Sequence, residues 1–412
     1  MKSRSSSLWI TTLAAAALCA CGGGGSSGSS TGTCYGSPTS GGGVLQSFTP
    51  PCDPGGGNIL VTASGEVLAL GGYAFPPASP DDVAFVDGWE IQFSKLLVTF
   101  DHVKLSSNPD LSPTDESQTG GVVAQADGPW AVDLHKGGPL PGAGGSGEQS
   151  VPIVAIKGSF DPAQRYAFGF DAVAATASAK NVNLDTSAGS TDLTDYQEMI
   201  TNGWTVLYVG TATWRGDAQG VTCTNTNATY DFSTIPKVVN FRIGFASPTT
   251  YVNCQNPRNN GAPFPGEEHQ RGIAVQSNTS TIAQATFHTD HPFWDSFVHD
   301  SPAHFDQVAA QYAGVSGTPT ATMDGMVGVD FTAFKDKLGK ALPWRSCLSS
   351  FTPGTGQQMH FDNLSVPFVL NGSDPAAALR DYRDYMTYNQ STFGHLNADG
   401  LCFVKRNYPS PH

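Results

Sequence analysis

The longest regular pattern in the sequence is an alternation of apolar and polar side chains over residues 88–105. Trp89, Ile91 and Phe93 fall on one face of an extended chain, and polar residues between them fall on the other. A period of two predicts a β-strand that is buried on one face. The alternation changes phase near Lys95–Leu96, which indicates a β-bulge or a fully buried central stretch. The sequence therefore predicts a fold based on β-structure.

Shorter strand-like runs occur on both sides of this segment, separated by turn-forming residues. They cover residues 65–70, 121–126, 130–135, 151–160, 165–174, 204–214, 237–246 and 281–288. The 47 glycines and 28 prolines disfavour long helical bundles and coiled coils. Because 39% of the residues are hydrophobic, the chain can build a core, which argues against global disorder. Strands at this spacing predict a sandwich or a barrel.

After Pro292 the pattern changes from strands to three short helices. Ser301–Pro302 supplies an N-cap and a proline at the first helical position. A second helix is predicted over residues 331–338, and a third begins at Asp374–Pro375. None of them is long enough to be stable alone, so we expect all three to pack against the sheet.

These patterns predict a mainly β fold with a helical C-terminal part, in the α+β class. We expect a disulfide-stapled, β-sandwich-like sheet in a β-rich domain, residues 58–290. The three short helices belong to residues 291–412, which form a C-terminal layer or a subdomain. The sequence leaves open whether these are two domains or two layers of one.

Residues 1–20 have the order of a secretory signal peptide, with two cations, an apolar core and then small residues. The apolar run is too short to span a membrane as a helix. Leu18–Cys21 resembles the lipobox of bacterial lipoproteins, in which the last cysteine is lipidated and becomes the mature N-terminus. Ordinary signal-peptidase cleavage is the alternative. The resemblance implies that Cys21 carries a lipid that binds a membrane. A glycine at position 22, directly after this cysteine, resembles the pattern of lipoproteins that are sorted to the outer membrane of the cell envelope.

Six cysteines remain once Cys19 leaves with the signal peptide and Cys21 takes the lipid. An even number in an oxidising compartment predicts disulfides rather than a metal site, and the sequence contains no CxxC motif. Their sequence neighbourhoods suggest the pairs Cys34–Cys52, Cys223–Cys254 and Cys347–Cys402. The first pair would staple residues 21–57, which begin with a flexible Gly/Ser tether over residues 22–32.

Reactive side chains are most concentrated in residues 288–304, which hold four of the ten histidines together with several acids. Imidazole and carboxylate groups are ligands of zinc, copper and non-haem iron. In an extended strand, His288 and His291 would face opposite sides of the sheet. A shared metal ion therefore requires a turn at the end of the strand, at Thr289 or Asp290.

We predict one transition-metal site formed by His288 and His291, with Asp290 and with His360 or His102 as further ligands. Zinc or copper is favoured over iron because imidazole outnumbers carboxylate in this segment. The simpler alternative is a loop whose histidines cap helices and bond to backbone carbonyls.

Two other functions stay open. One is a non-catalytic surface module that binds a glycan or an envelope protein through exposed aromatic rings. The other is a metal-dependent hydrolase, which is less favoured because no HExxH, Walker or Rossmann motif occurs in the folded part. Nucleic acid is excluded as a partner by the net charge of −14, which becomes −16 without the two cations of residues 1–20.

Overall fold

Strand β4 (Trp89–Ser106) is the centre of the structure, a computed structural model that describes residues 32–33, 39–79, 82–226, 228–297, 299–331, 333–348 and 379–408. Its predicted bulge is confirmed, because Lys95 pairs with Val209 while Phe93 pairs with Gly210, which leaves Ser94 between them. A Cβ atom at Gly210 would collide with the Gln92 carbonyl oxygen, so the close approach requires glycine.

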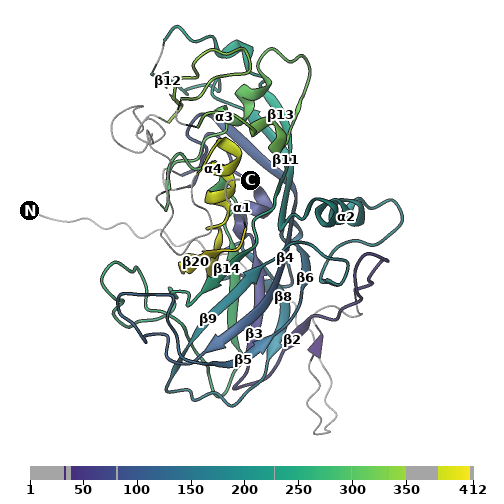
Figure 1. Cartoon of the computed structure of the whole chain (residues 1–412), viewed down its shortest axis with the longest axis vertical. Helices are drawn as coiled ribbons and strands as arrows, with labels where there is room; N and C mark the ends of the chain where they lie inside the picture. Colours follow the sequence, from purple (N-terminus) through teal and green to yellow (C-terminus); the bar gives the residue numbers. More distant parts are fainter. Residues whose placement is uncertain are drawn as a thin grey trace, which may run out of the picture. The chain divides into compact units, whose positions relative to one another are not determined.

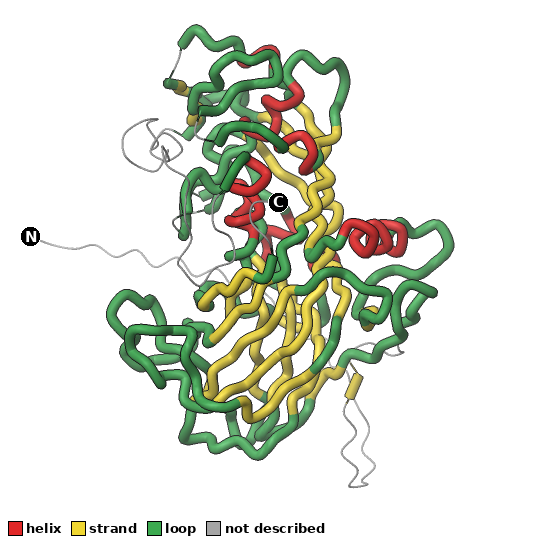
Figure 2. Tube along the Cα trace, in the orientation of Figure 1, coloured by secondary structure: helices red, strands yellow, loops and turns green. Residues whose placement is uncertain are grey.

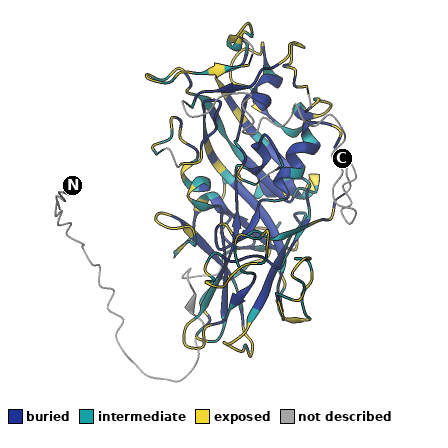
Figure 3. Cartoon of the chain, turned by 90° about the vertical axis from the view of Figure 1, so that its left-hand side faces the viewer, coloured by how far each residue is buried: buried dark blue, intermediate teal, exposed yellow. Residues whose placement is uncertain are grey.

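The predicted buried stretch of β4 is also confirmed. Beyond the bulge, Leu96 and Val98 belong to the main apolar core, whereas Leu97 packs into a second cluster on the opposite face. Figure 3 shows buried residues along the strands of the sheet. Helix α2 (Asp192–Asn202) covers the second cluster with Tyr196, so the middle of β4 is buried on both faces (Figure 1).

The large sheet has eleven strands, and its main path runs β17-β13-β11-β4-β9-β14-β20. Strands β5, β6, β10 and β15 pair beside this path. Besides β4, the strands of this sheet are β5 (Val122–Ala126), β6 (Trp130–Asp133), β9 (Arg165–Ala172), β10 (Lys180–Asn181), β11 (Val206–Trp214), β13 (Val238–Phe245), β14 (Thr249–Val252), β15 (Ile273–Ala274), β17 (Thr320–Ala321) and β20 (Phe403–Arg406).

A second sheet of five strands runs in the order β19-β16-β3-β8-β7. Its members are β3 (Ile59–Ser64), β7 (Leu140–Pro141), β8 (Gln149–Ile156), β16 (Thr281–Phe287) and β19 (Gly394–Leu396). The two sheets share one core, since the Phe287 ring lies 5.8 Å from Phe100 and 5.7 Å from Phe170 of the large sheet. This packing gives the mainly β, sandwich-like architecture that the sequence predicts (Figure 2). Two short pairs complete the strands: β1 (Gly32–Thr33) with β2 (Pro51–Asp53), and β12 (Thr224–Asn225) with β18 (Arg345–Ser346).

The helices differ in part from the sequence prediction. Residues 65–70, predicted as a strand, form helix α1 (Glu66–Gly71), because a short apolar run fits both periods. The predicted helix at 331–338 is wrong: these residues turn back on themselves, and Lys335 bridges Ala341. The remaining elements are α3 (Asp306–Ala309), α4 (Tyr382–Gln390), and the 3-10 turns η1 (Leu134–Lys136), η2 (Phe232–Thr234), η3 (His291–Phe293), η4 (Ala310–Tyr312) and η5 (Met323–Met326).

Helix α4 lies on the side of the large sheet opposite to α2 (Figure 1). It begins at Tyr382, capped by the Asp381 carboxylate, which accepts a 3.0 Å hydrogen bond from the Asp384 amide. The predicted start at Asp374–Pro375 lies outside the described residues. Among the described residues, no helix is long and apolar enough to cross a membrane.

The predicted use of cysteines in disulfides is confirmed for the described residues, but two of the predicted pairings are wrong. The bonds are Cys223–Cys347 and Cys254–Cys402, with sequence separations of 124 and 148 residues. Cys52 is also disulfide-bonded, and its predicted partner Cys34 lies outside the described residues. The pairing by sequence neighbourhood failed because strand pairing brings distant segments together, as β14 with β20 does next to Cys254.

We expect non-reducing peptide mapping to recover the Cys254–Cys402 pair. The Cys254→Ser/Cys402→Ser variant should lose about 4 kcal/mol of unfolding free energy, measured by urea denaturation. A cross-link over so long a loop strongly restricts the unfolded chain. A recovered Cys223–Cys254 peptide would contradict the fold around β14 and β20.

Glu116 gives the fold a pH dependence. It lies in the loop between β4 and β5, where Asn253 donates a 2.9 Å hydrogen bond to its backbone carbonyl and Gln255 lies 3.3 Å from its carboxylate. Burial raises the pKa of Glu116 to about 7, even though the Gln255 hydrogen bond lowers it. The folded state therefore binds the proton more tightly than the unfolded chain, and this stability is lost as the pH rises from the ordinary glutamate pKa through about 7.

In Glu116→Gln, we expect the free energy of unfolding to fall less between pH 5 and pH 8 than in the unmodified protein. The two falls in unfolding free energy should differ by no more than roughly 3 kcal/mol. Urea denaturation in the presence of a chelator measures it. Equal pH slopes for the two proteins would contradict the burial of this carboxyl group.

Candidate metal centre

Strand pairing places the first two imidazoles side by side. In the antiparallel pair of β16 and β19, Thr286 lies opposite His395, and the pairing extends to a 2.9 Å hydrogen bond from the His288 amide to the Phe393 carbonyl. His288 is two residues beyond Thr286, so its side chain is on the same face as His395. The two rings stack with centroids 4.0 Å apart.

A turn brings the third imidazole to the same place. Strand β16 ends at Phe287, and the chain turns at Thr289 into η3, which starts at His291. The Tyr73 and Thr289 hydroxyls hydrogen-bond at 2.7 Å and fix the turn. The ring of His291 lies 5.2 Å from that of His288, so the predicted turn at the end of the strand is confirmed.

His299, from the loop that follows η3, completes a group of four. Its ring lies 5.3 Å from His395 and 5.9 Å from His291. His288, His291, His299 and His395 each offer one nitrogen, and these four atoms all lie within 4.8 Å of one another. We call these residues the four-histidine cluster; its geometry can hold one metal ion.

Three of the four rings are buried and His299 is partly exposed, and burial keeps the two innermost rings uncharged. His291 and His395 are 0% and 1% exposed. Burial holds the pKa of His291 and that of His395 well below the usual histidine range, and the neighbouring histidines lower both further. A neutral imidazole carries the lone pair that a metal ligand requires.

Hydrogen bonds determine which nitrogen of His291 carries that lone pair. Its Nδ1 lies 2.8 Å from the Thr392 hydroxyl, which itself donates to the Asn389 carbonyl at 2.7 Å. The hydroxyl proton is therefore used, so the Thr392 oxygen accepts and His291 Nδ1 donates. Nε2 is left as the acceptor, and this buried atom has no hydrogen-bond partner within the described residues.

Of the other three rings, His395 is the one that shows the same division between a bonded and an unpartnered nitrogen. His395 bonds to backbone acceptors of Thr392 and Asp399, while its buried Nδ1 has no partner in the described part of the chain. His288 Nε2 lies 3.3 Å from the Ala398 carbonyl and 3.5 Å from Glu66 Oε1, two acceptors that place the proton on Nε2. His299 Nδ1 lies 3.2 Å from Asp300. Burial alone would lower the pKa of His299, but the Asp300 carboxylate raises it. Such outer acceptors are typical of metal-bound histidines.

Acidic groups and strained backbone surround the cluster. Burial raises the pKa of Glu66, and its His288 neighbour partly offsets this. Glu66, His288 and Asp399 form a second group of possible ligand atoms within 4.8 Å of one another. Glu66, Asp300 and Ala398 all have positive φ angles, of 61°, 61° and 73°. Such conformations are costly for residues other than glycine and concentrate at functional sites.

The predicted ligands that the structure describes lie in three places. His288 and His291 lie together, as predicted. Asp290 is not in the four-histidine cluster: its carboxylate accepts a 2.9 Å hydrogen bond from the Trp294 indole, whose ring lies 3.7 Å from that of His291. His102 lies instead with Asp101 and Asp127, where its Nδ1 is 3.0 Å from Asp171. His360 lies outside the described residues.

Two cluster residues were not among the predicted ligands. His299 lies in the histidine-rich segment, and that density is the only signal for it in the sequence. His395 has no such signal, because its place depends on the pairing of β19 with β16. The remaining histidine of the segment, His304, belongs to a separate buried contact, 3.2 Å from Asp295.

Comparison of the chain with protein-family models, with curated proteins and with solved structures found no match.

Thr392 provides a test of the arrangement around His291. In Thr392→Val, we expect the affinity for zinc to fall about 10- to 100-fold, because His291 loses the acceptor that fixes its tautomer. Competition with a chromophoric chelator measures the affinity. Thr392→Ser keeps the hydroxyl and is expected to retain the affinity. Equal affinities of the valine and serine variants would contradict the assigned hydrogen bond.

Proposed function

We propose that this protein binds one transition-metal ion through His288, His291, His299 and His395. The observation that supports this most strongly is the set of four nitrogens, one from each ring, that lie within 4.8 Å of one another; three of the rings are buried and His299 is partly exposed. Buried polar atoms in proteins are nearly always hydrogen-bonded, so unpartnered nitrogens that face one another need a common partner. A cation bound to all of them supplies it.

Zinc or copper fits this donor set best. Imidazole nitrogen suits both ions, whereas calcium, magnesium and manganese prefer oxygen ligands. A tetrahedral zinc ion places its nitrogens about 2.0–2.1 Å from the metal, so the cluster needs only a modest contraction. The acids Glu66 and Asp399 beside His288 further favour a cation over an anion.

The proposed role is metal binding rather than catalysis. A catalytic zinc site keeps one coordination position open for water or substrate. Four imidazoles fill the positions of a tetrahedral ion, so the hydrolase alternative lacks support from the geometry. The alternative of a surface module that binds through a row of exposed aromatic rings also lacks support among the described residues. Four of the tryptophans are buried: Trp89, Trp130, Trp294 and Trp344.

We further propose that the protein is a lipoprotein of the bacterial cell envelope, anchored to the outer membrane by lipid on Cys21. The signal-like residues 1–20 and the lipobox-like Leu18–Cys21 support this proposal. The disulfide-bonded cysteines are consistent with an oxidising compartment outside the cytoplasm. Labelling with a radioactive fatty acid in a bacterial host tests it, since Cys21→Ser should abolish the label.

Elemental analysis of protein purified without a histidine tag tests the metal proposal. We expect about one zinc or copper ion per chain, and a higher unfolding temperature when that ion is returned to chelator-treated protein. His291→Ala and His395→Ala should each lose the ion.

His135→Ala is the matched control, because the His135 ring bonds to the Ala69 carbonyl and is in none of the possible ligand groups. It should keep the full metal content. A protein that contains no metal and is not stabilised by added zinc or copper would show that the proposal is wrong.

A further inference from the structure

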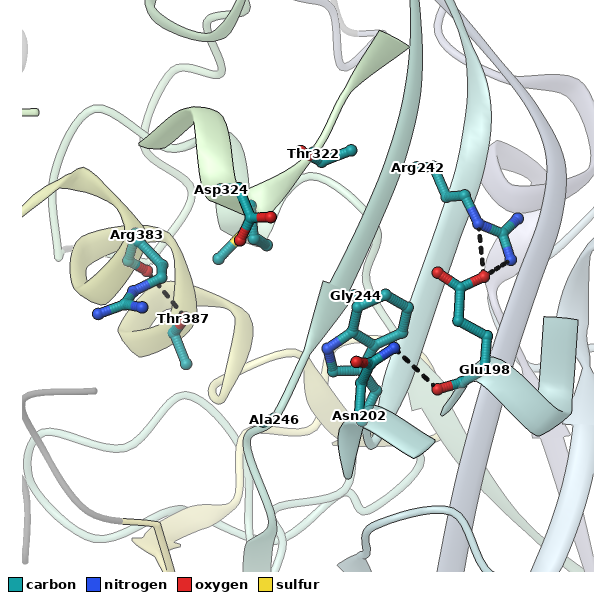
Figure 4. Close-up of a pocket in the computed structure, with 11 residues that line it drawn as sticks. Glu198, Asn202, Arg242, Gly244, Ala246, Thr322, Asp324, Arg383 and Thr387 are labelled. Carbon is teal, nitrogen blue, oxygen red and sulfur yellow. Dashed lines mark hydrogen bonds and ion pairs between the residues drawn. The ribbon is translucent and has the colours of Figure 1, made fainter. Parts of the chain in front are cut away.

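A second candidate site lies away from the four-histidine cluster, in a cavity of about 380 Å³ that is lined by residues of α2, β13, η5 and α4. The volume is in the range of small-molecule sites. Figure 4 shows Arg383 and Thr387 of α4 on one side, Arg242 and Glu198 on the other, and Asp324 between them. The metal proposal uses none of these residues.

Trp204 gives this cavity a flat aromatic wall. Its ring lies against Gly244, where any Cβ atom would collide with the indole. The backbone of Trp204 is held at both ends, since its amide donates to the Met199 carbonyl and its carbonyl accepts from Ala175, each at 2.9 Å. The ring is therefore fixed in place beside the cavity before any ligand binds, which limits the entropy cost of binding.

Polar side chains around the ring are also held in position. Arg242 donates to Glu198 and to Asp195, with an Nε–Oε2 distance of 2.9 Å to Glu198. The Asn202 amide donates to the Glu198 carbonyl at 3.0 Å. The lining thus holds both donors and acceptors, and its two guanidinium groups balance its two carboxylates.

This lining discriminates between ligand classes. A phosphate or another anion would meet the carboxylates of Glu198 and Asp324, and Arg242 is already paired with acids. A cation would meet two arginines, and a purely apolar ligand would take the solvent-accessible polar groups of the lining out of water without giving them partners. A neutral ligand with many hydroxyls satisfies both donors and acceptors, while its C–H face packs on the ring.

We propose that this cavity binds a neutral saccharide, with the sugar ring on Trp204 and its hydroxyls on Asn202, Asp324 and Arg383. The size of the cavity fits a mono- or disaccharide unit rather than a long chain. The site is independent of the metal proposal, because its residues are not in the four-histidine cluster.

Titration calorimetry and saturation-transfer NMR of the full chain test this proposal, with glucose, galactose, N-acetylglucosamine, maltose and cellobiose as probes. We expect at least one of them to bind with a millimolar or lower dissociation constant. Trp204→Ala should weaken binding at least tenfold. Asp324→Ala, which leaves the aromatic wall intact, should also weaken it and serves if the tryptophan variant does not fold.

Val238→Ala, at an exposed position on the same strand β13, is the control and should bind as the unmodified protein does. The proposal is overturned if none of the sugars binds, or if binding is unchanged in both Trp204→Ala and Asp324→Ala. Binding of inorganic phosphate alone, lost in Arg383→Ala, would also overturn it in favour of an anion site. Repeating the titrations with a chelator separates these outcomes from failure of the metal proposal.

Discussion

The position of β16 between β3 and β19 is the constraint on which the candidate metal centre depends. Thr286 of β16 pairs with Ser64 on one side and with His395 on the other. Two residues further along, the same arrangement puts His288 between Glu66 and the stacked ring of His395. The segments that carry Glu66, His288 and His395 are far apart in the sequence. They meet because the end of β16 is paired with β3 on one side and with β19 on the other. The site needs the complete five-stranded sheet before any ligand group is in place.

Burial then imposes a cost that an ion can offset. Each unpartnered polar atom in a core costs about 1–3 kcal/mol, and His291 Nε2 and His395 Nδ1 are both such atoms within the described chain. The left-handed backbone at Glu66 and Ala398 adds strain beside the same rings. In contrast, His291 Nδ1 and His288 Nε2 lie next to hydrogen-bond partners. His291 and His395 each have one nitrogen bonded outward and one buried nitrogen without a partner, which is the arrangement that protein metal sites use.

Local patterns in the sequence predicted local features well. The alternation over residues 88–105 predicted β4 with either a bulge or a buried middle, and the strand has both; the spacing of His288 and His291 predicted the turn between them. Long-range features could not be predicted in this way. The partner of Cys254 and the place of His395 both depend on which strands pair, and sequence neighbourhood carries no information on that. The helix predicted at 331–338 failed because an apolar period alone does not exclude a turn.

X-ray absorption spectroscopy at the metal edge tests the central claim most directly. For zinc, the four-histidine cluster predicts a first shell of four nitrogen ligands at about 2.0–2.1 Å, with the outer-shell scattering typical of imidazole rings. His395→Ala should reduce the imidazole number by one or abolish the signal. A first shell dominated by carboxylate or water oxygen, or one that is unchanged in His395→Ala, would contradict the account given for this site.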